Sequence, residues 1–233
     1  MKQKTNNQNT RYHVVILAGG IGERFGVMKQ FVPLNNLPLF IRTMRIFSRD
    51  PNCMITLVIP QEFGRIVDNC LKYHDIKVNV VVGGQTRQES VFKALKVVHF
   101  VSDWSDKVLI TDANRPLISK KTVEDCLSAL NDKKCQSVLT ISKSVNTSCI
   151  IDKSKLEKII NRDKMYDLLM PQGFKFELLY NAHQRTSLVN ATDDMQVILS
   201  VYPKTQPKFV EIPFWEGFKL THPEDYKVLE VLV

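Results

Sequence analysis

The stretch His13-Val14-Val15-Ile16-Leu17-Ala18-Gly19-Gly20 decides the fold that we expect for this chain of 233 residues. A short, mainly apolar run that ends directly in glycine is typical of a strand buried inside a parallel sheet. Glycines that follow such a strand also let backbone N–H groups approach a chain of phosphates. The segment therefore predicts an α/β fold with a ligand site at the end of its first strand.

Apolar runs and amphipathic segments continue to alternate along the chain. The predicted strands are 13–17, 54–59, 77–82, 107–110, 137–141 and 209–212. The predicted helices are 38–48, 62–73, a segment with Val91, Leu95 and Val98 on one face, 121–130, 176–183, one after 192–194, and one that begins within 221–225. Alternation of this kind predicts right-handed βαβ units in a Rossmann-like, mostly parallel sheet flanked by helices. Such sheets bind ligands at the carboxyl ends of their strands.

Two regions depart from this rhythm. Residues 1–11 are polar and rich in Asn and Gln, which predicts a disordered tail. Residues 142–162 alternate too loosely for a core strand and carry few large apolar side chains, so we expect a hairpin arm that protrudes from the sheet. Residues 12–233 are expected to form one domain.

Composition narrows the possible classes of protein. The net charge is +8, which suits nucleic acid or phosphorylated small molecules, but the sequence contains no nucleic-acid-binding motif. The five cysteines form no C-x-x-C pair, which favours a reducing compartment. Neither a signal peptide nor a membrane-spanning run is present. We therefore expect a cytoplasmic protein that binds neither membrane nor nucleic acid.

The glycine loop after the first strand combines Gly19, Gly20 and Gly22 with two cations, Arg24 and Lys29. It is not a Walker A loop, because no Gly-Lys-Ser/Thr follows. It also differs from the G-x-G-x-x-G dinucleotide fingerprint in the position of its next glycine. A glycine loop alone usually marks only a tight turn. Glycines with an arginine and a lysine directly after a first strand more specifically indicate phosphate binding.

Two further motifs follow strand ends. The segment 83–91, Gly-Gly-Gln-Thr-Arg-Gln-Glu-Ser-Val, can be read as a simple strand-to-helix turn. In the segment 111–117, Thr-Asp-Ala-Asn-Arg-Pro-Leu, Asp112 could bond nearby backbone in a turn, which is common. Alternatively, an acid beside a nucleotide site can hold Mg²⁺ against phosphate oxygens.

Leu17-Ala-Gly-Gly-x-Gly-x-Arg24, followed by Lys29-Gln-Phe-x-Pro-Leu34, resembles the signature loop of the 2-C-methyl-D-erythritol 4-phosphate and ribitol-5-phosphate cytidylyltransferases. Segments 83–91, 111–117, 161–174 and 217–225 resemble the family's other motifs in the expected order. The likeness runs from about residue 13 to residue 231. Departures include Met28 in place of a proline and a shorter loop between Arg24 and Lys29. The resemblance implies a single nucleotidyltransferase domain.

The resemblance also implies a set of site residues. The implied catalytic residues are Arg24, Lys29 and Lys219. The implied nucleotide-binding residues are Ala18, Gly19, Gly20, Gly22, Gly84, Gln85, Arg87, Ser90 and Asp112. The implied residues for the second substrate are Arg115, Thr147, Arg162 and Thr192. Asp112 would hold Mg²⁺, and Glu216 is a weaker second candidate ligand.

The expected reaction is transfer of CMP from CTP to a sugar-alcohol phosphate, which gives a CDP-alcohol and pyrophosphate. The motifs lean toward ribitol 5-phosphate as the acceptor, with 2-C-methyl-D-erythritol 4-phosphate as the alternative. In the family the arm joins two subunits, which implies a homodimer. Arg162 and Thr147 of one subunit would then serve the CTP site of the other.

Two other classes of protein remain as weaker alternatives. A short-chain NAD(P) oxidoreductase also carries a glycine loop, and Tyr73-x-x-x-Lys77 matches its catalytic pair, although that pair comes early in the chain. A basic nucleic-acid-binding or scaffold protein would explain the net charge. It offers no reason for cations and an acid to gather at one end of the sheet.

Overall fold

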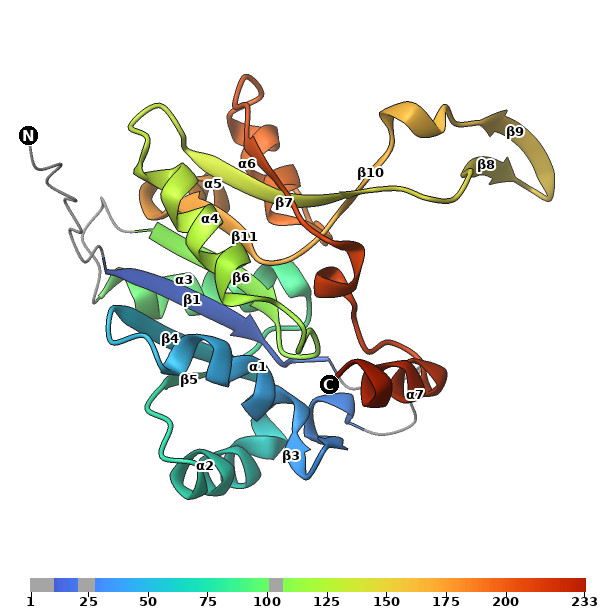
Figure 1. The fold of residues 1–233 in the computed structure, drawn as a ribbon. Helices are drawn as coiled ribbons and strands as arrows, with labels where there is room; N and C mark the ends of the chain where they lie inside the picture. Colours follow the sequence, from blue (N-terminus) through green and yellow to red (C-terminus); the bar gives the residue numbers. More distant parts are fainter. Residues whose placement is uncertain (1–10, 21–27, 101–106) are drawn as a thin grey trace, which may run out of the picture.

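The fold is built on a mixed β-sheet, which we describe from a computed structural model covering residues 11–20, 28–100 and 107–233. Gly22 and Arg24 lie outside these described residues. The strand order is β10-β7-β11-β6-β1-β4-β5, and β12 pairs with β7 (Figure 1). The strands are β1 (Tyr12–Leu17), β4 (Cys53–Ile59), β5 (Asn79–Val82), β6 (Lys107–Asp112), β7 (Ser137–Lys143), β10 (Tyr166–Leu168), β11 (Gln172–Lys175) and β12 (Lys208–Glu211).

The centre of the sheet is parallel, as the sequence predicts. β1 lies between β4 and β6 and pairs with both in parallel, and β4 pairs with β5 in the same way. Val14, Val15 and Ile16 have no exposed surface. Burial on both faces explains why the run is apolar without alternation. The predicted mostly parallel α/β fold is confirmed.

Two strands of the sheet, β11 and β10, were not predicted. β11 inserts between β6 and β7 and runs antiparallel to both. β11 contains Gln172, Gly173 and Phe174, so its sequence carries only one large apolar side chain. A strand held mainly by its two neighbours leaves a weak local pattern, because its stability comes from long-range pairing. β10, at the edge beyond β7, was missed for the same reason.

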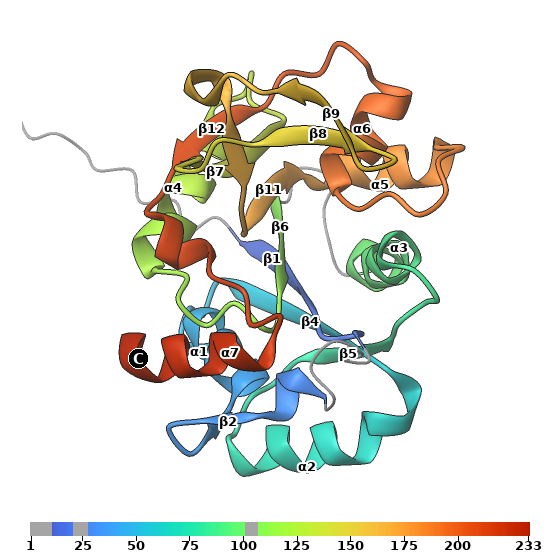
Figure 2. The same ribbon diagram turned by 90° about the vertical axis from the view of Figure 1, so that its right-hand side faces the viewer.

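Helices cover both faces of the sheet (Figure 2). On one face, residues of α1 (Leu39–Ser48), α2 (Gly64–Tyr73) and α4 (Lys120–Asn131) share an apolar cluster with β1 and β4. On the other, α3 (Arg87–His99), α5 (Phe176–Arg185) and α6 (Asp194–Val201) form a second cluster. Each amphipathic helix therefore buries its apolar stripe against the sheet.

Helix starts follow ordinary capping chemistry. The Thr86 side chain accepts a hydrogen bond from the N–H of Glu89 and begins α3, and Ser119 caps α4 in the same way. The last helix, α7 (Pro223–Leu232), begins with proline after a capping box made by His222 and Asp225. These are the start signals that the sequence displayed, so the predicted positions are close to the observed ones.

Short elements complete the chain. β2 (Pro33–Leu34) and β3 (Leu37–Pro38) form a separate two-stranded hairpin beside α7. Four 3-10 helices are described: η1 (Lys29–Phe31), η2 (Gln61–Phe63), η3 (Arg162–Lys164) and η4 (Phe214–Gly217). Across the described ranges, every helix is too short or too polar to cross a membrane.

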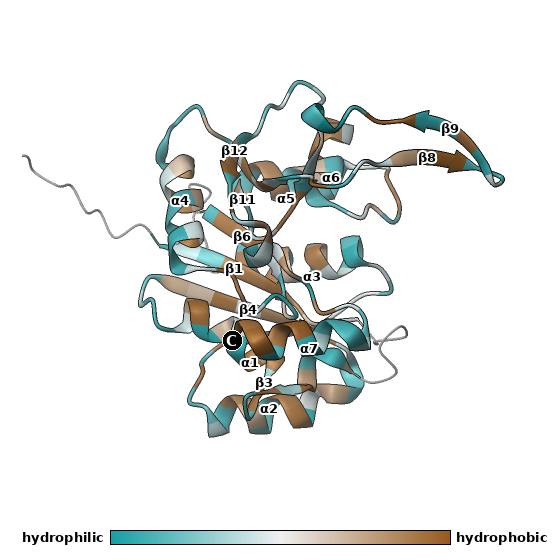
Figure 3. Ribbon diagram, turned by 45° about the vertical axis from the view of Figure 1, so that its right-hand side comes forward, coloured by the Kyte–Doolittle hydropathy of each residue, from teal (hydrophilic) through white to brown (hydrophobic). Residues whose placement is uncertain are grey.

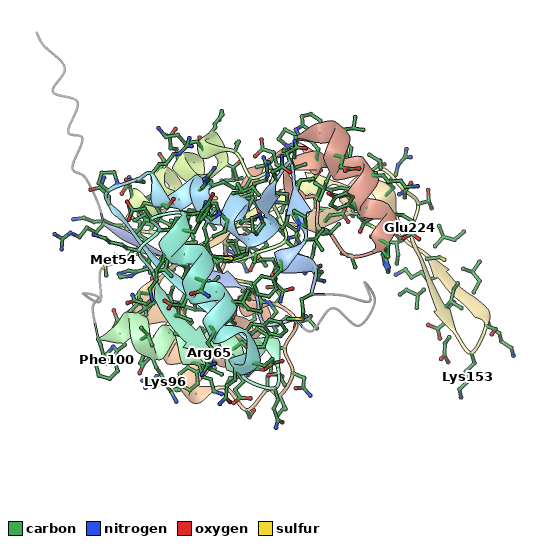
Figure 4. All side chains as sticks on the ribbon, turned by 90° about the horizontal axis from the view of Figure 1, so that it is seen from below. Met54, Arg65, Lys96, Phe100, Lys153 and Glu224 are labelled. Carbon is green, nitrogen blue, oxygen red and sulfur yellow. The ribbon has the colours of Figure 1, made fainter. Side chains whose placement is uncertain are left out.

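A hairpin arm stands away from the sheet. β8 (Cys149–Asp152) and β9 (Lys155–Ile159) pair only with each other, and all their residues are exposed. Lys153 lies at the outer tip of this hairpin (Figure 4). In Figure 3, much of the β8 ribbon nevertheless has the colour of hydrophobic residues. The protruding arm predicted near 142–162 is thus present, although β7 continues to Lys143 before it begins.

Candidate active site

A cavity of about 1100 Å³ opens at the carboxyl ends of β1, β4, β5 and β6. This is the edge at which a parallel sheet is expected to bind its ligand. The loops that follow these strands supply most of the lining, and Lys219 enters from near the C-terminus. The lining residues that matter below are Ala18, Gly19, Gly20, Lys29, Gln30, Gly84, Gln85, Arg87, Ser90, Lys93, Asp112 and Lys219.

Gln30 holds residues 18–20, the first part of the glycine loop. The Gln30 side chain is buried, and its Nε2 donates to the carbonyl oxygens of Ala18 at 2.8 Å and Gly20 at 3.1 Å. Because one amide carries two donors, it can fix two points of the loop at once. The sequence analysis gave Gln30 no role. The position of Gln30 directly after Lys29 was the sequence feature that could have indicated this role.

The second glycine loop is also held from within. The Ser90 hydroxyl accepts a hydrogen bond from the Gly84 N–H at 2.9 Å, and Ser90 itself is buried. A Cβ at Gly84 would lie 2.4 Å from Cδ of Glu89, so a side chain there would force Glu89 to move. The Gln85 N–H donates to the Glu89 carboxylate at 2.9 Å. Gly84, Gln85 and Ser90 therefore meet at one wall of the cavity, as predicted.

Asp112 lies at the end of β6 between two cations. Its Oδ2 is 3.0 Å from Nε of Arg115 and 2.9 Å from Nζ of Lys219. Burial would raise the pKa of Asp112, but Lys219 and Arg115, with Arg87, together hold this pKa well below its usual range. The Asp112 carboxylate is consequently ionised at neutral pH and holds Lys219 at the cavity wall, with Arg115 beside it.

The predicted metal site is reduced to a single carboxylate. Among the described residues, no three His, Cys, Asp or Glu side chains gather to hold a metal ion. Asp112 alone suits Mg²⁺, which keeps several waters and is often bound by one carboxylate together with substrate phosphates. Glu216 does not line the cavity, because its Oε2 accepts from the Ser119 N–H and the Thr122 hydroxyl at the start of α4. Its position does not support a role as second ligand.

Arg87 is fixed from beneath by a buried acid. Its Nη2 lies 2.6 Å from Oδ2 of Asp194, which has no exposed surface, and Oδ1 of Asp194 lies 3.2 Å from Nε2 of His183. Burial would lower the pKa of Arg87, but Asp194 raises it above its usual value. Burial would raise the pKa of Asp194, but Arg87 and His183 lower it. The pair holds the guanidinium at the cavity wall, which fits the predicted bracing role of Arg87.

Lys93 also lines the cavity, and the sequence analysis missed it. It projects from α3 and donates from Nζ to the Gly83 carbonyl oxygen at 3.0 Å. Lys93 comes three residues after Ser90, a spacing that puts both side chains on the same face of a helix. This spacing was the sequence feature that could have placed Lys93 beside Ser90. The cavity therefore gathers four cations, Lys29, Arg87, Lys93 and Lys219, and three acids, Glu62, Glu89 and Asp112, also line it.

Three predicted residues for the second substrate lie outside the cavity of their own chain. Arg162 and Thr147 are exposed at the base of the arm, where Nη1 of Arg162 is 3.4 Å from the Val145 carbonyl oxygen. Thr192 is exposed before α6 and bonds the Gln196 side chain. The fourth predicted residue, Arg115, stands beside the cavity through its contact with Asp112. The structure therefore does not bring the four residues predicted for the second substrate together in one cavity.

The structure does not support Tyr73 and Lys77 as the catalytic pair of an oxidoreductase. Tyr73 is the last residue of α2 and is 85 % exposed, and neither Tyr73 nor Lys77 lines the cavity. A catalytic pair of that class must reach the bound cofactor and substrate. The matching spacing is therefore coincidental, because these residues bracket a helix end.

The fold and the site together define a nucleotidyltransferase: a mostly parallel sheet presents glycine loops, several cations and the ionised Asp112 carboxylate at a single edge. Comparison with known proteins specifies the family. The sequence profile described as "IspD: 2-C-methyl-D-erythritol 4-phosphate cytidylyltransferase" matches residues 12–233. The chain belongs to this family and is a CTP-dependent nucleotidyltransferase.

Individual relatives agree over nearly the whole chain. The 2-C-methyl-D-erythritol 4-phosphate cytidylyltransferase of Clostridium botulinum is 31 % identical and covers 94 % of this chain and 97 % of its own length. That of Phocaeicola vulgatus is 32 % identical, with 95 % and 99 % covered. The crystal structure of 4-diphosphocytidyl-2C-methyl-D-erythritol synthase from Anaerococcus prevotii has a TM-score of 0.80 at 26 % identity, and 96 % of this chain and 98 % of that chain are covered.

The buried carboxylates predict acid-sensitive stability. The folded-state pKa values of Asp112 and Asp194 lie below the unfolded value of about 3.9, so their contribution is complete above that pH and is lost as the pH falls further. We expect the free energy of unfolding to fall below about pH 4. Asp194→Asn should remove part of this pH dependence. It should also lower the free energy of unfolding at neutral pH by about 3–5 kcal/mol, because it leaves Arg87 without its partner.

Urea unfolding between about pH 7 and pH 3 measures both effects. The matched control is Asp68→Asn, an exposed acid paired with Lys72, which should change the free energy of unfolding by less than about 0.5 kcal/mol. An Asp194→Asn variant as stable as wild type at neutral pH would show that the pair does not fix Arg87.

Proposed function

We propose that this enzyme transfers CMP from CTP to 2-C-methyl-D-erythritol 4-phosphate. The observation that carries the proposal is the cation-lined cavity at the carboxyl edge of the sheet, in a chain whose relatives are named for this acceptor. The sequence motifs leaned toward ribitol 5-phosphate. The relatives' names favour the other acceptor, so ribitol 5-phosphate becomes the second candidate.

The chemistry needs little from a general base. A phosphate oxygen of the acceptor, already anionic at neutral pH, attacks the α-phosphorus of CTP. A P–O bond forms there, the bond from the α-phosphorus to the bridging oxygen breaks, and pyrophosphate leaves. The difficulty is to bring two anions together, so catalysis rests on positioning and electrostatic stabilisation.

Lys29 and Lys219 are the described cations that we assign to the triphosphate, and we assign Arg24 with them from its place in the motif. Gly84, Gln85 and Ser90 are assigned to the cytosine ring. Backbone groups that pair with one base edge are left unsatisfied by another, which gives preference for CTP. Ala18, Gly19 and Gly20 offer backbone to the phosphates, as the held loop allows.

Enzymes of this family depend on a divalent metal ion. We propose Mg²⁺, with Asp112 as its protein ligand. Bound beside the triphosphate, it would neutralise phosphate charge. Lys219 shares Oδ2 of Asp112 with Arg115, and these contacts keep the carboxylate ionised and ready for a cation. We assign no metal role to Glu62 or Glu89, the other acids that line the cavity.

The arm supports a shared site between two subunits. Ile150, Ile151, Leu156 and Ile159 are 46–63 % exposed on a hairpin that has no core of its own. A two-stranded hairpin is marginal alone, and clustered exposed apolar residues mark an interface. We propose a homodimer in which Arg162 and Thr147 bind the acceptor phosphate in the partner's cavity. Their separation from their own cavity supports this arrangement.

The acceptor is tested by pyrophosphate release from CTP with each polyol phosphate in turn. We expect kcat/KM with 2-C-methyl-D-erythritol 4-phosphate to exceed that with ribitol 5-phosphate by at least about 100-fold, because a site built around one set of hydroxyls leaves groups unpaired with another. ATP, GTP and UTP should turn over poorly with the same acceptor. Faster turnover of ribitol 5-phosphate would reinstate the acceptor that the motifs favoured.

The electrostatic assignment is tested at the cations. Lys29→Ala and Arg24→Ala should each lower kcat by about 100-fold or more, the scale for loss of one preorganised charge, and Lys219→Ala should lower activity as well. Lys133→Ala, an exposed lysine outside the cavity, is the matched control and should leave kcat unchanged. Near-normal kcat in Lys29→Ala would mean that this lysine does not reach the α-phosphate.

The shared site is tested by mixing two inactive variants, Lys29→Ala and Arg162→Ala. In a shared-site dimer, a heterodimer carries one cavity with both defects and one intact cavity, so activity should partly return after subunit exchange. Exchange is followed with differently tagged subunits. If exchange occurs and activity stays absent, both residues serve the same cavity. A monomer by light scattering would also refute the arrangement.

A further inference from the structure

A second cavity, of about 1110 Å³, lies between α1 and α4 on one face of the sheet. It is as large as the nucleotide cavity, and the two share no lining residue. Small-molecule sites typically enclose about 300–1,000 Å³. Nothing in the proposed transfer of CMP uses this space, although it has the dimensions of a binding site.

The lining is apolar at depth. Tyr12 and Val123 are almost completely buried, and partly buried aliphatic side chains of α1 and α4 extend this surface. The apolar lining residues are Tyr12, Leu37, Ile46, Ile118, Val123 and Leu127. An apolar wall with a few polar groups is the usual composition of a small-molecule pocket. The occupant is therefore expected to present an apolar body.

Three arginines of one helix face supply the charge. Arg42, Arg45 and Arg49 follow at intervals of three and four residues and all line the cavity. None of them forms an ion pair within the described part of the chain, although Nη2 of Arg45 lies 3.5 Å from Nδ1 of His74. Like charges so close on one helix repel each other, so an anion between them is favoured.

The acids that line the same cavity have other partners. Oδ1 of Asp50 accepts from the N–H of Asn52 at 2.9 Å and from its side chain at 3.1 Å. The Glu124 carboxylate lies 3.4 Å from Nζ of Lys120, one turn away on α4. These acids therefore do not form ion pairs with the arginines of α1, and the cavity keeps an excess of positive charge.

Arg42 lies in the wall of this cavity and is held by the backbone. Its Nη2 donates to the Leu34 carbonyl oxygen at 3.0 Å, while its Nε is buried and, among the described residues, has no hydrogen-bond partner. Burial lowers the pKa of Arg42, and Arg45 lowers it further. The bond to Leu34 fixes Arg42 in the cavity wall, and its buried Nε does not itself reach the cavity.

We propose that the second cavity binds a small phosphorylated molecule with an apolar body, separately from CTP. The guanidinium groups would receive the phosphate, since Arg matches phosphate geometry with paired donors. The apolar lining would receive the body. Residues 1–11 of the chain do not fit as occupant, because they carry three cations and no acid. The inference does not depend on the acceptor used in the transfer reaction.

The test measures binding of 1-naphthyl phosphate by its fluorescence, with the native protein saturated with CTP to fill the first cavity. Inorganic phosphate and 1-naphthol serve as the anion alone and the body alone. We expect 1-naphthyl phosphate to bind at least about tenfold more tightly than either. Arg45→Glu/Arg49→Glu should weaken it at least about tenfold, because two charge-assisted contacts become repulsive.

The matched control is Lys133→Glu/Lys134→Glu, which makes the same change of net charge at exposed residues outside both cavities. It should bind the probe as wild type does, and both double variants should keep CTP turnover and thermal stability. Equal binding by the two double variants would overturn the proposal. So would displacement of the probe by CTP, equal affinity for 1-naphthol, or failure of the probe to bind.

Discussion

The pairing of β1 with β4 and β6 is the constraint on which the site depends. Leu17, the last residue of β1, is in register with Asp112 on one side and with Val58 on the other. Two further bonds extend this register beyond the strands: Ala18 N–H to the Val58 oxygen at 2.8 Å, and Ala113 N–H to the Leu17 oxygen at 2.9 Å. A slip by one residue would turn Asp112 to the opposite face of the sheet. The glycine loop and the acid therefore meet because an apolar strand fixes where both begin.

From that edge, the site is organised by buried acids that hold cations. Asp112 fixes Arg115 and Lys219, and Asp194 fixes Arg87, so most of the positive charge is placed before any substrate arrives. Placing charge in advance is the main way in which an enzyme stabilises developing negative charge without reorganising itself. Loss of either acid would leave a partly buried cation unpaired, so these contacts stabilise the fold as well as positioning the cations.

The sequence predicted those features that are encoded locally. The apolar run of β1, the strand-to-helix turn before α3 and the start of α7 within residues 221–225 lie close to what they determine, and each was found near its predicted place. β11 was missed because it is held by neighbours far along the chain. Gln30 was missed because its hydrogen bonds to Ala18 and Gly20, twelve and ten residues earlier, form only in the folded chain. The same limit applies to Arg162 and Thr147, whose assignment rests on the family resemblance.

The C-terminal segment shows why such long-range contacts decide the site. Leu220 exchanges two hydrogen bonds with Asn114, one at 3.1 Å from its N–H and one at 2.6 Å to its oxygen, which places Lys219 beside Asp112. α7 then packs Leu229 into an apolar cluster with Leu34 and Leu39. The Tyr226 hydroxyl donates to the Pro33 oxygen at 2.6 Å, shortly after η1 and Lys29. Lys29 and Lys219, far apart in the chain, are therefore held on one scaffold by the last helix, so the phosphate-binding role proposed for both cations requires an ordered α7.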